Sequence, residues 1–144
     1  MSALRIGIIG SGGIATHRAH SFAALPECRI AAIAARNPET GPALAEAHGS
    51  DLTTDWRSLV ARDDLDTLVV ATHNALHGEI VAAGLEQGRH IFCEYPTSRR
   101  PAEWSRIASL IEGSAVLRLT HNAHVSEEHL ALSDSVQSSA PPAF

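Results

Sequence analysis

The stretch Leu4-Arg5-Ile6-Gly7-Ile8-Ile9-Gly10-Ser11-Gly12-Gly13-Ile14-Ala15 decides the fold of this chain. Its first half is a short, almost unbroken apolar run, which is typical of a strand buried on both faces of a parallel sheet. The run ends at Gly10, and residues 14–25 then predict a helix that stops at Pro26. A strand, a glycine-rich turn and a helix in this order predict the first unit of a dinucleotide-binding fold.

The spacing of small residues in the turn indicates a phosphate site. Gly10 permits a tight turn, Gly12 lets the backbone approach a pyrophosphate, and Ala15 lets the helix pack closely on the strand. The helix N-terminus at Gly13 and Ile14 offers free N–H groups and the positive end of a dipole. We therefore expect all five residues to contact a dinucleotide. The alternative is a glycine-rich turn with a purely structural role.

The rest of the chain alternates between strand and helix patterns. Apolar runs predict strands at 29–35, 65–71, 90–93 and 115–119, and helices are expected at 38–49, 55–60, 75–86 and 101–111. This alternation predicts an α/β protein with a doubly wound parallel sheet of the Rossmann type. We expect Asp55 to cap its short helix, and Thr97 or Ser98 to cap the helix that follows them. One domain at 1–132 and a flexible tail at 133–144 complete the expected organisation.

Composition and charge exclude several classes of function. Of the 144 residues, 44% are hydrophobic, and the net charge of −5 argues against a nucleic-acid-binding protein. No apolar run approaches the roughly 18 residues of a membrane span, and Met1 leads directly into a strand without a signal peptide. Cys28 and Cys93 lie far apart in sequence, which predicts free thiols and a cytoplasmic location.

The end of the second expected strand bears on the choice of dinucleotide. NAD sites place an acidic residue there to bind the ribose hydroxyls. This chain has Ala34-Ala35-Arg36-Asn37 and no acid. Arg36 could form a charge-assisted pair with a 2′-phosphate, so the sequence favours NADP, with NAD still possible. The alternative is a solvated surface arginine.

Four segments, in order, resemble a known family. They are the 10–15 turn, the run 65–72 with His77 five residues on, the run 83–93, and Glu94-Tyr95-Pro96. Over about residues 3–130 the chain resembles the N-terminal domain of the glucose–fructose oxidoreductase and inositol dehydrogenase family (Gfo/Idh/MocA). That resemblance implies an NAD(P)-dependent oxidoreductase.

The resemblance also implies roles for individual residues. Thr72, His73 and Asn74 would lie along the cofactor, although His73 stands where the family usually has Pro. His77 would face the nicotinamide side and take part in catalysis.

Glu94 would be both a cofactor-binding and a catalytic residue. Tyr95 would be the proton donor in place of the family's usual Lys, as in the biliverdin reductases of the family, which also read Glu-Tyr-Pro. With an ordinary pKa of about 10, such a tyrosine is neutral and carries no positive charge. A packed, structural Tyr95 is the alternative.

The resemblance covers only part of a family member, because members normally continue into a second domain that forms the substrate pocket. We therefore expect a homo-oligomer or a partner subunit to cover the open cofactor face. The first hypothesis is an NADP-dependent hydride transfer to or from a small carbonyl- or imine-like substrate. A non-catalytic dinucleotide-binding accessory protein and a small enzyme of non-redox acid–base chemistry are the alternatives.

Histidine spacing also raises the question of a metal site. The pair His73 and His77 and the run 121–129, which holds three histidines, have spacings that suit zinc. No cysteine accompanies them, and a His-Glu-x-x-His motif is absent. We therefore expect no metal.

Overall fold

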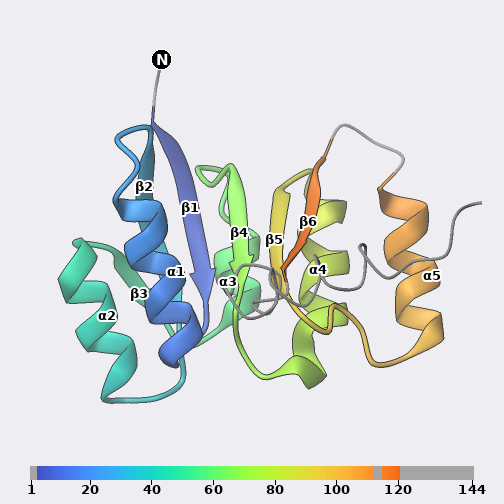
Figure 1. Cartoon of the computed structure of the whole chain (residues 1–144), viewed down its shortest axis with the longest axis horizontal. Helices are drawn as coiled ribbons and strands as arrows, with labels where there is room; N and C mark the ends of the chain where they lie inside the picture. Colours follow the sequence, from blue (N-terminus) through green and yellow to red (C-terminus); the bar gives the residue numbers. More distant parts are fainter. Residues whose placement is uncertain (1–2, 112–114, 121–144) are drawn as a thin grey trace, which may run out of the picture.

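The computed structural model describes residues 3–111 and 115–120 (Figure 1). The expected tail at 133–144, and the domain limit at 132, lie outside these residues. The elements are β1 (Leu4–Ile9), α1 (Gly13–Ala23), β2 (Cys28–Ala34), α2 (Thr40–His48), β3 (Asp51–Thr53), α3 (Trp56–Val60), β4 (Thr67–Val70), η1 (Asn74–Leu76), α4 (His77–Glu86), β5 (His90–Glu94), α5 (Pro101–Leu110) and β6 (Leu117–Thr120).

The strands form one parallel sheet in the order β3-β2-β1-β4-β5-β6 (Figure 1). The order reverses between β1 and β4, because the chain builds the sheet first toward β3 and then toward β6. This confirms the predicted α/β, doubly wound Rossmann architecture. The carboxyl ends of β1 and β4 therefore diverge into connections on opposite faces, which leaves a crevice between them.

Two apolar clusters cover the two faces of the sheet. One joins α1 and α2 to one face through residues such as Ala15, Leu44 and Ile8. The other joins α3, α4 and α5 to the opposite face, with Ile80 and Ile9 among its members. Neighbouring residues of a strand thus face different clusters, which explains why the strands are continuous apolar runs rather than alternating ones.

The structure adds one strand that the sequence did not predict. β3 has only three residues, and its Asp51 and Leu52 are exposed, so it carries no apolar signal. The second helix begins at Thr40 rather than at 38. Asn37 accounts for this later start, because its Oδ1 accepts the N–H groups of Glu39 at 2.9 Å and Thr40 at 3.0 Å.

Of the two predicted helix caps, one is confirmed and one is wrong. Asp55 caps α3 by accepting the N–H of Arg57 at 3.0 Å. For α5 the capping position belongs to Arg100, which supplies no side-chain cap. Ser98 instead accepts the N–H of Arg100 at 3.2 Å and donates to Glu103 at 3.0 Å, so it organises the turn before the helix.

An ion-pair network lies at the amino ends of the strands, opposite the crevice. Arg62 donates to Asp64 through Nε and Nη2, both at 2.8 Å, and to Asp51 through Nη1 at 2.8 Å. Arg5 also pairs with Asp64. These four side chains connect the starts of β1 and β3 with the loop before β4.

Candidate dinucleotide-binding site

Gly10 allows the ends of β1 and β4 to approach each other closely. Its φ of +126° lies in the region that side chains disfavour, and a Cβ there would come 2.3 Å from the carbonyl oxygen of Ala71. Gly12, by contrast, would place a Cβ in open space and is the N-cap of α1 without a side-chain cap. The first N–H groups of α1 therefore remain open to an anion approaching over Gly12.

A side-chain hydrogen bond between Ser11 and Thr40 also holds the glycine turn in place. The hydroxyl oxygens of Ser11 and Thr40 lie 2.7 Å apart, and the Ser11 residue is buried. This bond ties the glycine turn to the start of α2. Sequence reasoning missed it, because the two residues are far apart along the chain and no local pattern links them.

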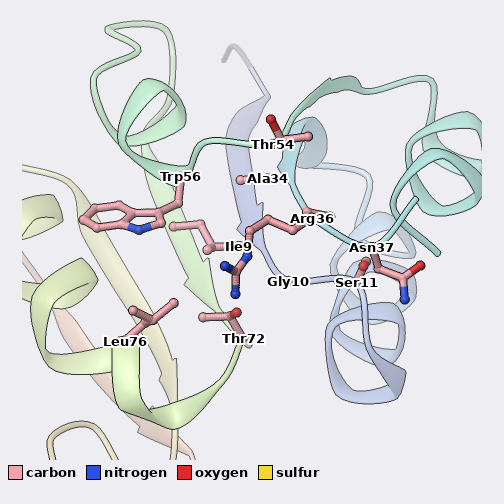
Figure 2. Close-up of a pocket in the computed structure, with 11 residues that line it drawn as sticks. Ile9, Gly10, Ser11, Ala34, Arg36, Asn37, Thr54, Trp56, Thr72 and Leu76 are labelled. Carbon is pink, nitrogen blue, oxygen red and sulfur yellow. The ribbon is translucent and has the colours of Figure 1, made fainter. Parts of the chain in front are cut away.

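The crevice between β1 and β4 holds a cavity of about 200 Å³ (Figure 2). It brings together the predicted residues Gly10, Arg36 and Thr72, which follow three different strands. Sequence reasoning missed Thr54, Trp56 and Leu76, which also line it. The complete described lining is Ile9, Gly10, Ser11, Ala34, Ala35, Arg36, Asn37, Thr54, Trp56, Thr72 and Leu76. We call this cavity the β1–β4 cleft.

Arg36 reaches from the end of β2 into the β1–β4 cleft. Figure 2 shows its guanidinium group directed toward Thr72. It is the only charged residue in the described lining, and it forms no ion pair with another described residue. The cleft therefore offers one cation and no carboxylate where a nucleotide would place its adenosine half.

The loop after β4 contributes Thr72 and Leu76 to the cleft, but not the residues immediately after Thr72. Thr72 lines it, whereas His73 and Asn74 are exposed and do not appear in its lining. The Nδ1 of His73 accepts the N–H of Ala75 at 3.3 Å and so caps η1. The predicted contacts of His73 and Asn74 with a cofactor remain predictions.

His77 is buried, with only 2% of its surface exposed. Its Nδ1 lies 2.8 Å from the carbonyl oxygen of Pro96, and its Nε2 lies 3.0 Å from that of Thr72. Only an N–H can donate to a carbonyl, so a neutral ring makes one of these bonds and an imidazolium makes both. The ring connects the loop after β4 to the turn after β5.

Glu94 and Tyr95 point into different surroundings. The Oε1 of Glu94 lies 2.5 Å from Nε of Arg18 in α1, and both side chains are largely buried. The Arg18 guanidinium also lies 5.3 Å from the centre of the Phe92 ring. Tyr95 is 68% exposed and precedes a cis peptide bond to Pro96. Of the predicted catalytic residues, Tyr95 is therefore the one open to a substrate.

No group of three or more His, Cys, Asp or Glu side chains suited to a metal occurs within residues 3–111 and 115–120. The histidine-rich run at 121–129 lies outside them. In the same described ranges, no helix combines the length and apolar character needed to cross a bilayer. Cys28 and Cys93 are both free thiols, as predicted.

Comparison with known proteins identifies the family of the chain. Residues 4–122 match the family model described as an oxidoreductase family with an NAD-binding Rossmann fold. The chain therefore belongs to the Gfo/Idh/MocA family.

Two curated relatives are about a third identical to the chain. The levoglucosan dehydrogenase of Pseudarthrobacter phenanthrenivorans is 33% identical over 132 residues, which are 83% of this chain and 33% of the relative. A dTDP-3,4-didehydro-2,6-dideoxy-alpha-D-glucose 3-reductase of Streptomyces violaceoruber is 34% identical over 109 residues, which are 75% of this chain and 32% of the relative. The chain thus spans about a third of the length of these relatives.

A solved structure shows the same arrangement of elements. The biliverdin reductase from Synechocystis sp. PCC 6803, in complex with biliverdin and NADP+, superposes with a TM-score of 0.87 at 26% identity. The match covers 93% of this chain and 43% of that chain.

Proposed function

We propose that this chain is the dinucleotide-binding part of an NADP-dependent oxidoreductase that moves a hydride to or from a small carbonyl- or imine-like substrate. The observation that carries the proposal is the β1–β4 cleft, in which the Gly10 turn, Arg36 and Thr72 converge. When bound, the nicotinamide supplies or accepts the hydride. The residues of this chain bind the cofactor, orient it and provide a proton.

The protein groups in the cleft fit a dinucleotide with a 2′-phosphate. The open N–H groups at the start of α1 suit a pyrophosphate, because they present the positive end of the helix dipole. Arg36, the only cation in the described lining, suits a 2′-phosphate. The end of β2 has no carboxylate to bind a ribose diol, which makes NAD the weaker candidate.

Tyr95 is the residue we assign to proton transfer. It stands where most members of the family have Lys, and its phenol can donate a hydrogen bond or a proton without carrying a positive charge. Its side chain is 68% exposed, so it is accessible but is not shielded from water. Proton transfer at Tyr95 would become efficient once another surface covers it.

His77 and Glu94 support this site rather than touch a substrate. Both nitrogens of the His77 ring lie against backbone carbonyls, and the Glu94 carboxylate is paired with Arg18. We assign both as positioning residues that fix the backbone on either side of Tyr95. This assignment replaces the catalytic role expected for them from the family resemblance.

The substrate side would be completed by a further domain or by another subunit, including a second copy of the chain. The relatives are about three times as long as the matched segment, which supports this part of the proposal. The free thiols of Cys28 and Cys93 are compatible with a reducing cytoplasm.

A non-catalytic dinucleotide-binding protein is the second candidate function, and the exposure of Tyr95 to water favours it.

A titration of NADPH and NADH against the purified protein, read by cofactor fluorescence, tests the proposal. We expect NADPH to bind at least about tenfold more tightly, as one charge-assisted contact can supply. Arg36→Ala should remove that preference, whereas Arg29→Ala, a control on an exposed arginine at the start of β2, should keep it. Equal binding of both cofactors to the unmodified protein would exclude the role of Arg36. Oxidation of bound NADPH by carbonyl compounds then separates an enzyme from a binding protein.

A further inference from the structure

A second cavity, of about 420 Å³, lies beside Tyr95 and shares no residue with the β1–β4 cleft. It is formed by the loop after β5, the first part of α5 and one residue of β6. Its described lining is Tyr95, Pro96, Thr97, Ser98, Arg99, Arg100, Pro101, Trp104 and Leu119. We call it the Tyr95 cavity.

The Tyr95 cavity carries positive charge in a chain whose net charge is −5. Two arginines line it, and no carboxylate does so within the described residues. Arg100 is neutralised, because its Nε and Nη2 donate to Oε1 of Glu103 at 3.0 and 2.5 Å. Arg99 is exposed and forms no ion pair with any residue in the described ranges. Arg99 is therefore the cation that remains available to a ligand.

Large aromatic and apolar side chains form part of the cavity wall, beside the small polar Thr97 and Ser98. Trp104 is 45% exposed and Leu119 is 50% exposed, and the ring of Tyr95 is more exposed still. Aromatic rings provide flat faces against which a planar or ring-shaped ligand can pack. One available cation beside such walls is the combination expected of a site for a small organic anion.

Arg99 also lines a second hollow, which reaches the loop that follows β4. This neighbouring hollow of about 340 Å³ is lined by Ala75, Arg99, Arg100 and Glu103. Ala75 belongs to η1, in the same loop as Thr72, which lines the β1–β4 cleft. An anion held by Arg99 would thus be bound between the Tyr95 cavity and the loop that follows β4.

We propose that the Tyr95 cavity binds the anionic group of a small organic substrate, a carboxylate or a phosphate ester. Arg99 is its cationic contact, and Trp104 is the wall against which its apolar part packs. A cavity of about 420 Å³ lies within the range of volumes of small-molecule sites. This inference deepens the function proposed above and rests on it, since Tyr95 would then face the substrate's reacting group.

Three organic probes test the inference: benzoate, phenyl phosphate and the neutral isostere benzamide, each followed by ligand-observed NMR and calorimetry. Inorganic phosphate, followed by calorimetry, is the comparison probe without an apolar part. The protein is used with and without saturating NADP+, because phosphate-containing probes can also enter the β1–β4 cleft. We expect both anions to bind about tenfold more tightly than benzamide, as one charge-assisted contact can supply. Arg99→Gln should remove this difference, and Trp104→Ala should weaken phenyl phosphate more than inorganic phosphate.

Arg36→Gln is the matched control, since it removes the cation of the other cavity. The inference is overturned if Arg99→Gln binds the anions as the unmodified protein does, or if only Arg36→Gln weakens them. It is also overturned if the anions bind no more tightly than benzamide. Loss of NADPH binding with intact, Arg99-dependent anion binding would instead refute the proposed cofactor function alone.

Discussion

Arg18 and Glu94 form an ion pair between α1 and the end of β5, with side chains only 15% and 8% exposed. The pair joins the helix that would receive a pyrophosphate to the residue before Tyr95. Glu94→Gln should therefore lower the free energy of unfolding by about 3 kcal/mol, because it removes one charge of a largely buried ion pair. Urea unfolding measures this loss. Glu86→Gln, which breaks an exposed pair with Arg106, should cost less than about 1 kcal/mol; equal losses in the two variants would contradict the prediction.

Two glycine substitutions in the turn should separate stability from binding. Gly10→Ala should both destabilise the protein and abolish NADPH binding, because its Cβ would lie 2.3 Å from the Ala71 oxygen at a φ of +126°. Gly12→Ala should cost less than about 1 kcal/mol, since its Cβ meets nothing. It should nevertheless weaken NADPH, because the methyl group occupies the approach of the pyrophosphate. Thermal unfolding and cofactor fluorescence give the two readouts, and normal NADPH binding by Gly12→Ala would contradict the expected pose.

Replacing His77 should loosen the two segments that its ring connects. His77→Phe keeps an aromatic ring of similar size but removes the two ring nitrogens that lie against the carbonyl oxygens of Thr72 and Pro96. We expect hydrogen exchange to accelerate at residues 72–76 and 95–98, with a loss of about 1 kcal/mol of stability from the lost hydrogen bonding of the ring. His17→Phe, at an exposed position in α1, is the control. Unchanged exchange in both segments would show that the ring does not hold them together.

The two thiols should differ in reactivity. Burial raises the pKa of Cys93 to about 12, and its side chain is inaccessible. The pKa of Cys28 is also raised, first by burial and then by Glu27, but this residue is partly exposed. At pH 8 we expect slow alkylation of Cys28 alone, with Cys93 modified only after unfolding. Mass spectrometry identifies the modified residue, and Cys28→Ser should abolish the reaction of the folded protein.

The network around Asp64 should make stability depend on pH. Hydrogen bonds from Arg62 and Arg5 hold the pKa of Asp64 well below its usual range. A lowered folded-state pKa stabilises the protein fully above the unfolded value of about 4, and this stabilisation is lost progressively as the pH falls from there through the folded-state pKa. Asp64→Asn should therefore cost about 1 kcal/mol at pH 7, after allowance for screening of these partly exposed groups, and less at pH 3. Asp63→Asn, at an exposed neighbour, should show no such dependence in urea unfolding at the two pH values.

Most of the fold could be predicted from the sequence because its strands are buried on both faces. Continuous apolar runs such as residues 68–71 are unambiguous when a helix pattern follows each of them. The exception, β3, forms at the sheet edge, where three half-exposed residues need no apolar pattern. Its position depends on pairing with β2, which is a tertiary contact and has no local signature.

The sequence predicted the residues of the candidate site that follow directly after strands. It did not predict the contacts of the site that depend on tertiary packing. Gly10 and Arg36 each follow a strand of the expected parallel sheet, so both could be expected at its carboxyl edge, where the cleft lies. The presence of Trp56 in the cleft could not be predicted, because it depends on the path of the loop between β3 and α3. The partner of Glu94 was equally hidden, since Arg18 lies 76 positions earlier. Such contacts are set by helix packing, which spacing along the chain does not encode.

The ion-pair network of Arg5, Arg62, Asp64 and Asp51 lies at the opposite end of the strands from the β1–β4 cleft. Because of this separation, the amino ends of the strands form an edge of the domain to which a linker or a solid support can be attached. A linker or a solid support joined there would leave the glycine turn and Arg36 facing solution. The domain therefore offers a starting scaffold for an immobilised nucleotide sensor, in which anchoring and recognition can be engineered independently.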